Sequence, residues 1–367
     1  MLLCKYYVIL HAKKMTMSDK IQMKLQCPMP VLDYDIITLG HGSGGKLTNR
    51  LLDKTVFDIF KNETIETRHD GAILSLGEKV VFSTDSFVIS PIFFPGGDIG
   101  ELAVNGTVND VAMCGGIPKY LSLSFIIEEG MKMTQFWDVL VGIKYAAEKA
   151  GVQIVTGDTK VVERGKGDKI FVNTTGIGSL HPKADIRSER VNVGDKIIVS
   201  GNIATHGIAI LSVRRGLEFE TDIESDTCNL NHTVLKLIDE FDANVHLMRD
   251  PTRGGVASSL NEISRDTGFG FELWEKDLPI DNQVLGACEI MGLDPLYVAN
   301  EGVFIAIVDP KVAEAYVKRL KELEYGSNAA IIGEVVDDHP GKVLIESEIG
   351  GRRVVHMQVG EQLPRIC

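Results

Sequence analysis

Short apolar runs bounded by glycine and aspartate alternate along the chain with longer stretches of helical periodicity. The strand-like runs in the first half are AILSL, KVVFSTDS, KYLSLSFII, VQIVTGDT and KIFVNTTGIG. Runs of this length, rich in β-branched and aromatic residues and closed by turn formers, are typical of β-strands. Because strands and helices are interspersed, the pattern predicts a layered fold of mixed type, α+β or α/β.

Two helices are predicted between these runs. One covers TQFWDVLVGIKYAAEKAG, where apolar residues recur at helical spacing, with Thr134 as the expected N-cap and Gly151 at the end. The other covers IGELAVNGTVNDVAMCGG and carries Asn105, Asn109 and Asp110. Its alanines and glycines leave room for a neighbouring element, so we expect this helix to be closely packed.

The pattern of strand, glycine loop and helix starts again after HPKADIRSERVNVGD, and we place a domain boundary within residues 182–193. The final segment, KVLIESEIGGRRVVHMQVGEQLPRIC, predicts a hairpin followed by a tail. The predicted units are residues 1–30, a loosely ordered extension; 31–182, a first domain; 183–346, a second α+β domain; and 347–367, the hairpin and a mobile tail.

Composition narrows the function classes. The 367 residues are 44% hydrophobic, which is enough for a large core in two domains. The net charge of −13 disfavours a nucleic-acid surface, although acids that hold Mg²⁺ are compatible with bound ATP. The six cysteines lack zinc or disulfide spacing, so we expect reduced thiols in the cytoplasm. The sequence contains neither a signal peptide pattern nor a membrane-spanning run.

The stretch DIITLGHGSGGKLTNRLL predicts an apolar strand, a glycine-rich turn and a helix. Gly40, Gly45 and Lys46 fit a phosphate-binding loop, but Leu47 stands where a serine or threonine should ligate Mg²⁺. The motif is therefore not a true Walker sequence, and a plain glycine-rich turn is the alternative. The backbone N–H groups of Gly42, Gly44 and Gly45 still offer donors to an anion.

Five aspartates stand in loops beside predicted strands, and each alone is most simply a turn or cap residue. Carboxylates that converge at strand ends repel one another unless a cation neutralises them, and all-oxygen ligation suits Mg²⁺. The predicted magnesium ligands are Asp70, Asp85, Asp110, Asp158 and Asp250.

Lys160 and Glu301 each stand beside an apolar strand with a glycine nearby, where a ligand can come close. Ordinary surface positions are the alternative for both. The histidines show no metal-binding spacing and are interpreted as structural, His206 included, with His41 in the glycine loop the one exception of interest.

Taken together, GHGSGGK, STDSFVISPIFFPGGDIGELAVNGTVNDVAM, VTGDTKVV, RDPTRGG, NEG and the terminal PRIC closely resemble the HypE family of hydrogenase maturation carbamoyl dehydratases. The resemblance covers about residues 38–367. It implies the superfamily of aminoimidazole ribonucleotide synthetase, with a two-domain α+β fold of the PurM-like type, a flexible C-terminal tail and a homodimer formed by the first domains. ATP is expected at the glycine loop and Asn109, with Mg²⁺ on the aspartates.

The resemblance further implies that the substrate is the chain's own last residue. The carbamoyltransferase HypF would load a carbamoyl group on Cys367, and ATP would phosphorylate the carbamoyl oxygen. Lys160 would balance the charge on that oxygen, and Glu301 would take a proton from the nitrogen. The resulting thiocyanate would pass its cyanide to iron on the HypC–HypD complex for [NiFe]-hydrogenase.

Two alternatives remain open. The first is a selenophosphate or purine-pathway synthetase of the same superfamily; the glycine loop lacks the thiol that the former carries there. The second is a non-enzymatic scaffold with a terminal thiol, which leaves the aspartates unexplained.

Overall fold

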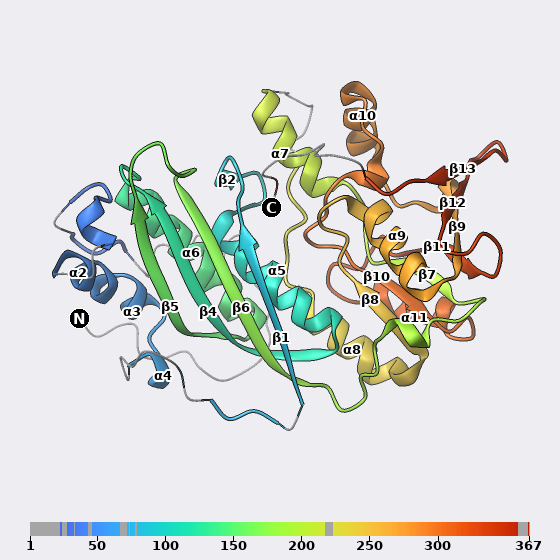
Figure 1. Cartoon of the computed structure of the whole chain (residues 1–367), viewed down its shortest axis with the longest axis horizontal. Coiled ribbons are helices and arrows are strands. Elements are labelled where there is room, and N and C mark those ends of the chain that lie inside the picture. The colour runs from blue at the N-terminus through green and yellow to red at the C-terminus, as the bar shows by residue number, and fades with distance from the viewer. Residues whose placement is uncertain are drawn as a thin grey trace.

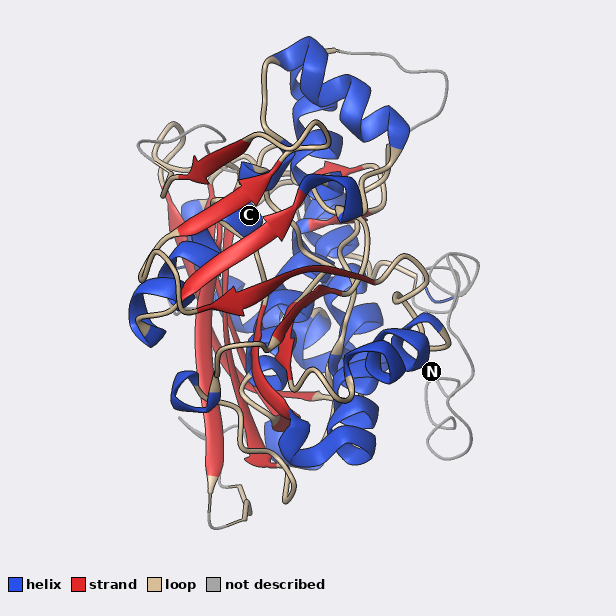
Figure 2. Ribbon diagram, turned by 90° about the vertical axis from the view of Figure 1, so that its right-hand side faces the viewer, coloured by secondary structure: helices blue, strands red, loops and turns tan. Residues whose placement is uncertain are grey.

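The computed structural model describes residues 23, 28–32, 34–42, 46–66, 72, 74–77, 79–216, 223–358 and 366. Two halves lie side by side along the long axis, each built on its own sheet (Figure 1). In Figure 2 the strands of the second half lie in front of the long strands of the first. No described helix has both the length and the apolar character needed to span a bilayer.

The described helices are α2 (Lys46–Lys54), α3 (Val56–Ile59), α4 (Glu63–Glu66), α5 (Ile99–Met113), α6 (Met133–Ala150), α7 (Thr205–Arg215), α8 (Asn231–Phe241), α9 (Gly255–Thr267), α10 (Asn282–Met291) and α11 (Ala313–Lys321), with 3-10 turns η1 (Leu39–Gly42), η2 (Ser188–Arg190), η3 (Asp242–Asn244), η4 (Glu275–Asp277) and η5 (Pro295–Tyr297). The strands are β1 (Val80–Phe87), β2 (Phe93–Phe94), β3 (Gly97–Asp98), β4 (Gly116–Glu128), β5 (Gln153–Val162), β6 (Ile170–Leu180), β7 (Lys196–Val199), β8 (Val245–Arg249), β9 (Gly270–Trp274), β10 (Ile305–Val308), β11 (Ala330–Val336), β12 (Val343–Glu346) and β13 (Arg352–Val355).

The first sheet has the order β1-β6-β4-β5, and α5 and α6 pack on one of its faces. Side chains alternate along β4, so that Leu121, Leu123 and Phe125 are buried under the helices. Phe82 and Ile126 belong to the opposite, outer face and are 66% and 45% exposed. This alternation is what a sheet with one covered face requires.

The second sheet has the order β13-β12-β9-β11-β7-β10-β8 and is covered on both faces. Helices α8 and α11 pack on one face, and α9 packs on the other. The interior strands β7 and β10 are consequently apolar throughout or nearly so.

Helix α5 lies where the two halves meet and packs against β1, α6 and α8. Fourteen of its fifteen residues are buried, and Asp110 is the exception. A Cβ atom on Gly106 would lie 2.9 Å from the Phe87 ring, so a small residue is needed there. The predicted close packing of this helix is confirmed, because layers on several sides leave it no polar face.

Most predicted elements are confirmed, including α6, which ends at Gly151 with φ 74°, and the terminal hairpin of β12 and β13. The N-cap prediction is wrong: the N-cap lies two residues earlier, at Lys132 rather than Thr134, and α6 begins at Met133. The described residues of AILSL form no strand. Ahead of the glycine loop, the expected strand is reduced to one bridge between Ile36 and Lys132, because only a short turn is available as its partner.

The sheets separate between Leu180 and Lys196, and the predicted boundary at residues 182–193 falls in this connection. Nearly all of residues 1–30 and most of the tail lie outside the described residues. The limits of the four predicted units stay predictions.

Candidate active site

Three aspartates meet in the interface between the halves, and we call them the interface acids: Asp85, Asp110 and Asp250. Asp85 points from the covered face of β1, Asp110 sits in the last turn of α5, and Asp250 directly follows β8. Ser83 donates a hydrogen bond to Asp110 Oδ2 at 2.8 Å. Strand alternation and the position of α5 thus bring together acids that lie up to 165 residues apart in the sequence.

Burial raises the pKa of all three interface acids. For Asp85 it is the largest cause, partly offset by the Ser86 backbone N–H and by Arg253. The pKa of Asp250 rises to about 7, first from burial and then from the charge of Asp110. Carboxylates that raise one another's pKa in this way are stabilised by any cation placed among them.

The described residues do not by themselves form a complete metal site, since no three His, Cys, Asp or Glu side chains among them could enclose an ion. Asp70 lies outside the described residues. The donors at the interface are carboxylate oxygens, which suit Mg²⁺, an ion that often completes its shell with phosphate oxygens and water. The interface acids therefore fit a magnesium ion that arrives with a nucleotide, and the ion itself stays a prediction.

Glu301 lies beside the interface acids and is 3% exposed. Its Oε1 atom is buried and has no hydrogen-bond partner in the part of the chain that the structure describes. Its pKa is raised well above the usual range by burial and then by the charges of Asp226, Asp250, Asp85 and Asp110. A raised pKa makes the ionised carboxylate a stronger proton acceptor. Glu301 is therefore suited to proton transfer.

The second predicted catalyst, Lys160, lies elsewhere. Lys160 and Asp158 stand together on the outer face of β5, 62% and 61% exposed, and form an ion pair of 2.6 Å. This pair lowers the pKa of Asp158, the opposite shift to that of the interface acids. Strand β5 is at the far edge of the sheet from β1, so Asp158 is not one of the interface acids within this chain.

The glycine loop packs beside this exposed pair. A Cβ atom on Gly42 would lie 2.5 Å from the backbone nitrogen of Val161, so only glycine allows η1 to lie against β5. Lys46 is the first residue of α2. Gly44, Gly45 and Cys367 lie outside the described residues.

Asn109 joins the halves. Its Nδ2 donates to the carbonyl of Cys228 at 3.0 Å, and its Oδ1 accepts from the Leu230 backbone N–H at 2.8 Å. Both ends of the amide are thus engaged with the segment before α8. The contact of Asn109 with a nucleotide stays a prediction.

The penultimate residue, Ile366, is docked in the protein core. It is 3% exposed, and its carbonyl lies 2.7 Å from His206 Nε2. The other ring nitrogen of His206 lies 2.7 Å from Ser225 Oγ, and Phe94 packs edge-on against the ring. Burial lowers the pKa of His206 to about 4, so the neutral ring donates from Nε2 to the tail and accepts from Ser225.

The docking site is linked to the segment that precedes Glu301. The backbone N–H of Gly207 donates to the carbonyl of Ala299 at 3.1 Å, and Ala204 N–H donates to Asn300 Oδ1 at 2.7 Å. The start of α7 is therefore fixed to the segment that leads into Glu301. The sequence interpretation of His206 as purely structural missed this contact, because nothing local marks a partner 160 residues away.

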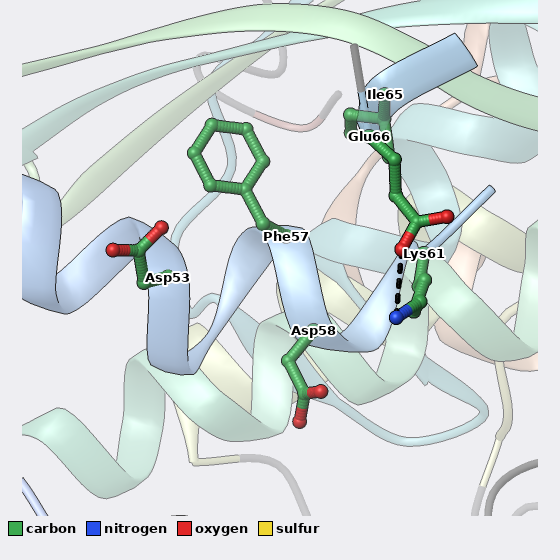
Figure 3. Close-up of a pocket in the computed structure, with 6 residues that line it drawn as sticks. All are labelled: Asp53, Phe57, Asp58, Lys61, Ile65 and Glu66. Carbon is green, nitrogen blue, oxygen red and sulfur yellow. Dashed lines mark ion pairs between the residues drawn. The ribbon is translucent and has the colours of Figure 1, made fainter. Parts of the chain in front are cut away.

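A separate pocket of about 100 Å³ lies on α2, α3 and α4 (Figure 3). Lys61 and Glu66, which both line it, form a 2.7 Å ion pair on one side of the pocket. None of the predicted site residues lines it, and it is too small for a nucleotide, since ligand pockets usually exceed about 300 Å³.

Comparison with known proteins places this geometry in a family. The models for AIR synthase related proteins match residues 68–180 with their N-terminal domain and residues 192–346 with their C-terminal domain. Carbamoyl dehydratase HypE of Rhizobium leguminosarum bv. viciae is 46% identical over 332 residues, which are 90% of this chain and 95% of that protein.

Solved structures agree. Hydrogenase maturation protein HypE in complex with ATP is 46% identical, with a TM-score of 0.87 over 90% of this chain and 99% of that one. The structure of a HypE–HypF complex is also similar. Its matched chain is 43% identical, with a TM-score of 0.74 over 85% of this chain and 99% of that one. The two-domain fold and these similarities lead to one conclusion: the chain belongs to the HypE family of carbamoyl dehydratases that act in hydrogenase maturation.

Proposed function

We propose that this chain dehydrates an S-carbamoyl group on its own Cys367 to a thiocyanate, using ATP, and so provides cyanide ligands for the iron of [NiFe]-hydrogenase. The tail contact carries the proposal. Ile366 is buried against His206, and Cys367 is the next residue along the chain. The segment that hydrogen-bonds to the start of α7 leads into Glu301. A docking site for the chain's own end, next to a buried candidate base, is expected if the tail is the substrate.

The residues present support the chemical roles. The carbamoyl oxygen takes the γ-phosphoryl group of ATP, which turns a poor leaving group into phosphate. Glu301 accepts a proton from the carbamoyl nitrogen, which is possible because its buried Oε1 has no hydrogen-bond partner among the described residues. The interface acids would hold Mg²⁺, which would neutralise charge on the phosphates, and the glycine loop from Gly42 to Lys46 would offer its backbone donors to the nucleotide.

In a homodimer, the exposed pair of Asp158 and Lys160 would have a role. The outer face of the first sheet carries Phe82 and Ile126 uncovered, and it also presents Asp158 and Lys160. Pairing two such faces buries the apolar side chains and sets Lys160 against a second copy. Phe82→Glu should dissociate such a dimer in sedimentation experiments, whereas Ile349→Glu, at an exposed turn of the second half, should not.

The partners follow from the reaction. A protein such as HypF loads the tail, as a solved HypE–HypF complex suggests for its own chains. The HypC–HypD complex then accepts the cyanide, and all of these steps take place in the cytoplasm.

Intact mass spectrometry after incubation with HypF, carbamoyl phosphate and ATP tests the function. The wild type should gain one carbamoyl group and then lose the mass of one water. Cys367→Ala should gain nothing while still binding ATP. A Cys367→Ala chain that still acquires the dehydrated modification would contradict the proposal.

A further inference from the structure

Dehydration of a carbamoyl group removes two protons from one nitrogen. The oxygen leaves with phosphate, and a single carboxylate accepts only one proton at a time. With Glu301 as the first acceptor, the reaction needs a second group that can take the other proton.

Asp226 is the carboxyl group held most directly against Glu301. The backbone N–H of Glu301 donates to Asp226 Oδ1 at 3.1 Å. A Cβ atom on Gly302 would lie 1.8 Å from the carbonyl oxygen of Asp226, so the two segments are pressed together. Asp226 is also the first charge among those that raise the pKa of Glu301, after burial.

Around this contact, three buried oxygen atoms accept no hydrogen bond from the described residues: Asn105 Oδ1, Asp226 Oδ2 and Glu301 Oε1. Asn105 is 4% exposed, and its Nδ2 is directed to Thr227 Oγ1 at 3.3 Å, next to Asp226 in the chain. Buried acceptors without donors cost free energy, so they indicate a ligand that brings N–H groups. A primary amide nitrogen has two such donors.

We propose that Asn105, Asp226 and Glu301 bind the NH₂ end of the carbamoyl group, and that Asp226 accepts the second proton. The inference rests on the proposed function. In the first step one N–H bond breaks, its proton goes to Glu301, a C=N bond forms, and the carbamoyl oxygen bonds to phosphorus as ADP leaves.

In the second step the remaining N–H bond breaks and its proton goes to Asp226. The electron pair completes the C≡N bond, and the C–O bond breaks with its pair leaving on phosphate. Asn105 takes no proton and orients the nitrogen between the two carboxyl groups.

Single-turnover reactions of the carbamoylated chain with ATP test the assignment, with ADP and thiocyanate measured separately. Asp226→Asn keeps the acceptor for the Glu301 N–H but cannot take a proton. We expect its ADP burst to stay within about twofold of wild type, while thiocyanate formation slows by roughly a hundredfold, as for loss of a general base. Asp226→Glu retains a carboxyl group and should keep the two products more closely coupled than Asp226→Asn does.

Asp195→Asn is a matched control, because Asp195 is a buried carboxyl group paired with His246 at 2.7 Å in the second half. It should lower thermal stability and leave the ratio of ADP to thiocyanate unchanged. Equal loss of ADP and thiocyanate in Asp226→Asn, or wild-type rates, would overturn the role of Asp226. If Asp226→Asn does not fold, Asn105→Ala tests the proposed binding of the carbamoyl NH₂ end. It should slow thiocyanate formation several-fold without slowing carbamoylation. A wild type that forms no thiocyanate would instead refute the proposed function.

Discussion

The interface acids and the Asp158–Lys160 pair on the outer sheet face have the same kinds of side chain but opposite electrostatics. At the interface, burial raises the pKa of Asp250 to about 7, and Arg249 offsets this rise only in part. Burial also raises the pKa of Asp85, and Arg253 likewise offsets that rise only in part. On the outer face, Lys160 lowers the pKa of Asp158, and both side chains are more than half exposed. Water and the direct counter-charge of Lys160 stabilise the negative charge of Asp158. The interface acids still require a cation or a proton to balance their charge.

This electrostatic difference indicates in which of the two regions charged side chains can act strongly on one another. Charges removed from water interact strongly, so small changes among Glu301, Asp226 and the interface acids have large consequences. Exposed pairs are screened, and their energies are small. Catalysis should therefore be far more sensitive to isosteric changes at the interface than on the outer face.

The largest effect is expected for Glu301→Gln, which keeps the shape of the side chain and removes its proton acceptor. The rate of thiocyanate formation should fall by about 10²–10⁴-fold, while carbamoylation by HypF and ATP binding persist. Single-turnover mass spectrometry measures this. Normal dehydration in the variant would show that Glu301 is an ordinary buried residue and not the proton acceptor.

A smaller effect is expected for Asp110→Asn, which removes one of the interface acids. The affinity for ATP in the presence of Mg²⁺ should fall by about tenfold or more, and removal of Mg²⁺ by chelation should erase the difference from wild type. Calorimetry measures the affinity. Asp281→Asn, at the N-cap of α10, is the control that should bind ATP normally. Equal affinity in Asp110→Asn would exclude it from the nucleotide site.

His206→Phe tests the tail contact. The variant keeps a ring but leaves the Ile366 carbonyl without a donor, which costs about 1–3 kcal/mol and lowers the docked fraction by roughly tenfold or more. Alkylation of Cys367, located by the mass of the C-terminal peptide, should accelerate, and dehydration should slow. His206→Gln can donate and should restore part of both. Unchanged alkylation would show that the tail does not depend on this contact.

The pH dependence of the same contact has a definite sign. Because the pKa of His206 falls from 6.5 to about 4 on folding, the unfolded chain binds more protons between these values. The stabilising effect of the neutral ring is then complete above pH 6.5 and is lost as the pH falls toward 4. Wild-type alkylation rates, corrected for thiol ionisation, should be constant above pH 7.

The smallest effect is expected for Asp158→Asn, which breaks the exposed ion pair. The free energy of unfolding of one chain should change by less than about 1 kcal/mol, because solvent screens the pair. Urea unfolding measures it. A larger loss would mean that Asp158 has a buried environment in the assembled protein, as expected if this face pairs with a second copy.

Local sequence determined much of the architecture. The period-2 runs specified β1, β4, β5 and β6, the helical spacing specified α6, and the paired glycines after β12 specified the terminal hairpin. The motifs were sufficient to indicate the family and to nominate Glu301, because glycine loops and short acidic motifs are contiguous in the chain. Where the local signal was weak, the expected strands are missing or reduced: the described residues of AILSL form no strand, and one bridge at Ile36 is all that remains ahead of the glycine loop.

Only the tertiary structure decided which candidates meet. It placed Asp158 on the outer face and away from the interface acids, set Asp226 against Glu301, and docked Ile366 on His206. These pairs are separated by tens to hundreds of residues, and their contacts follow from how α5, α7 and the two sheets pack. Periodicity reports which face of an element is buried, but the partner across that face is chosen by packing, which no local pattern encodes.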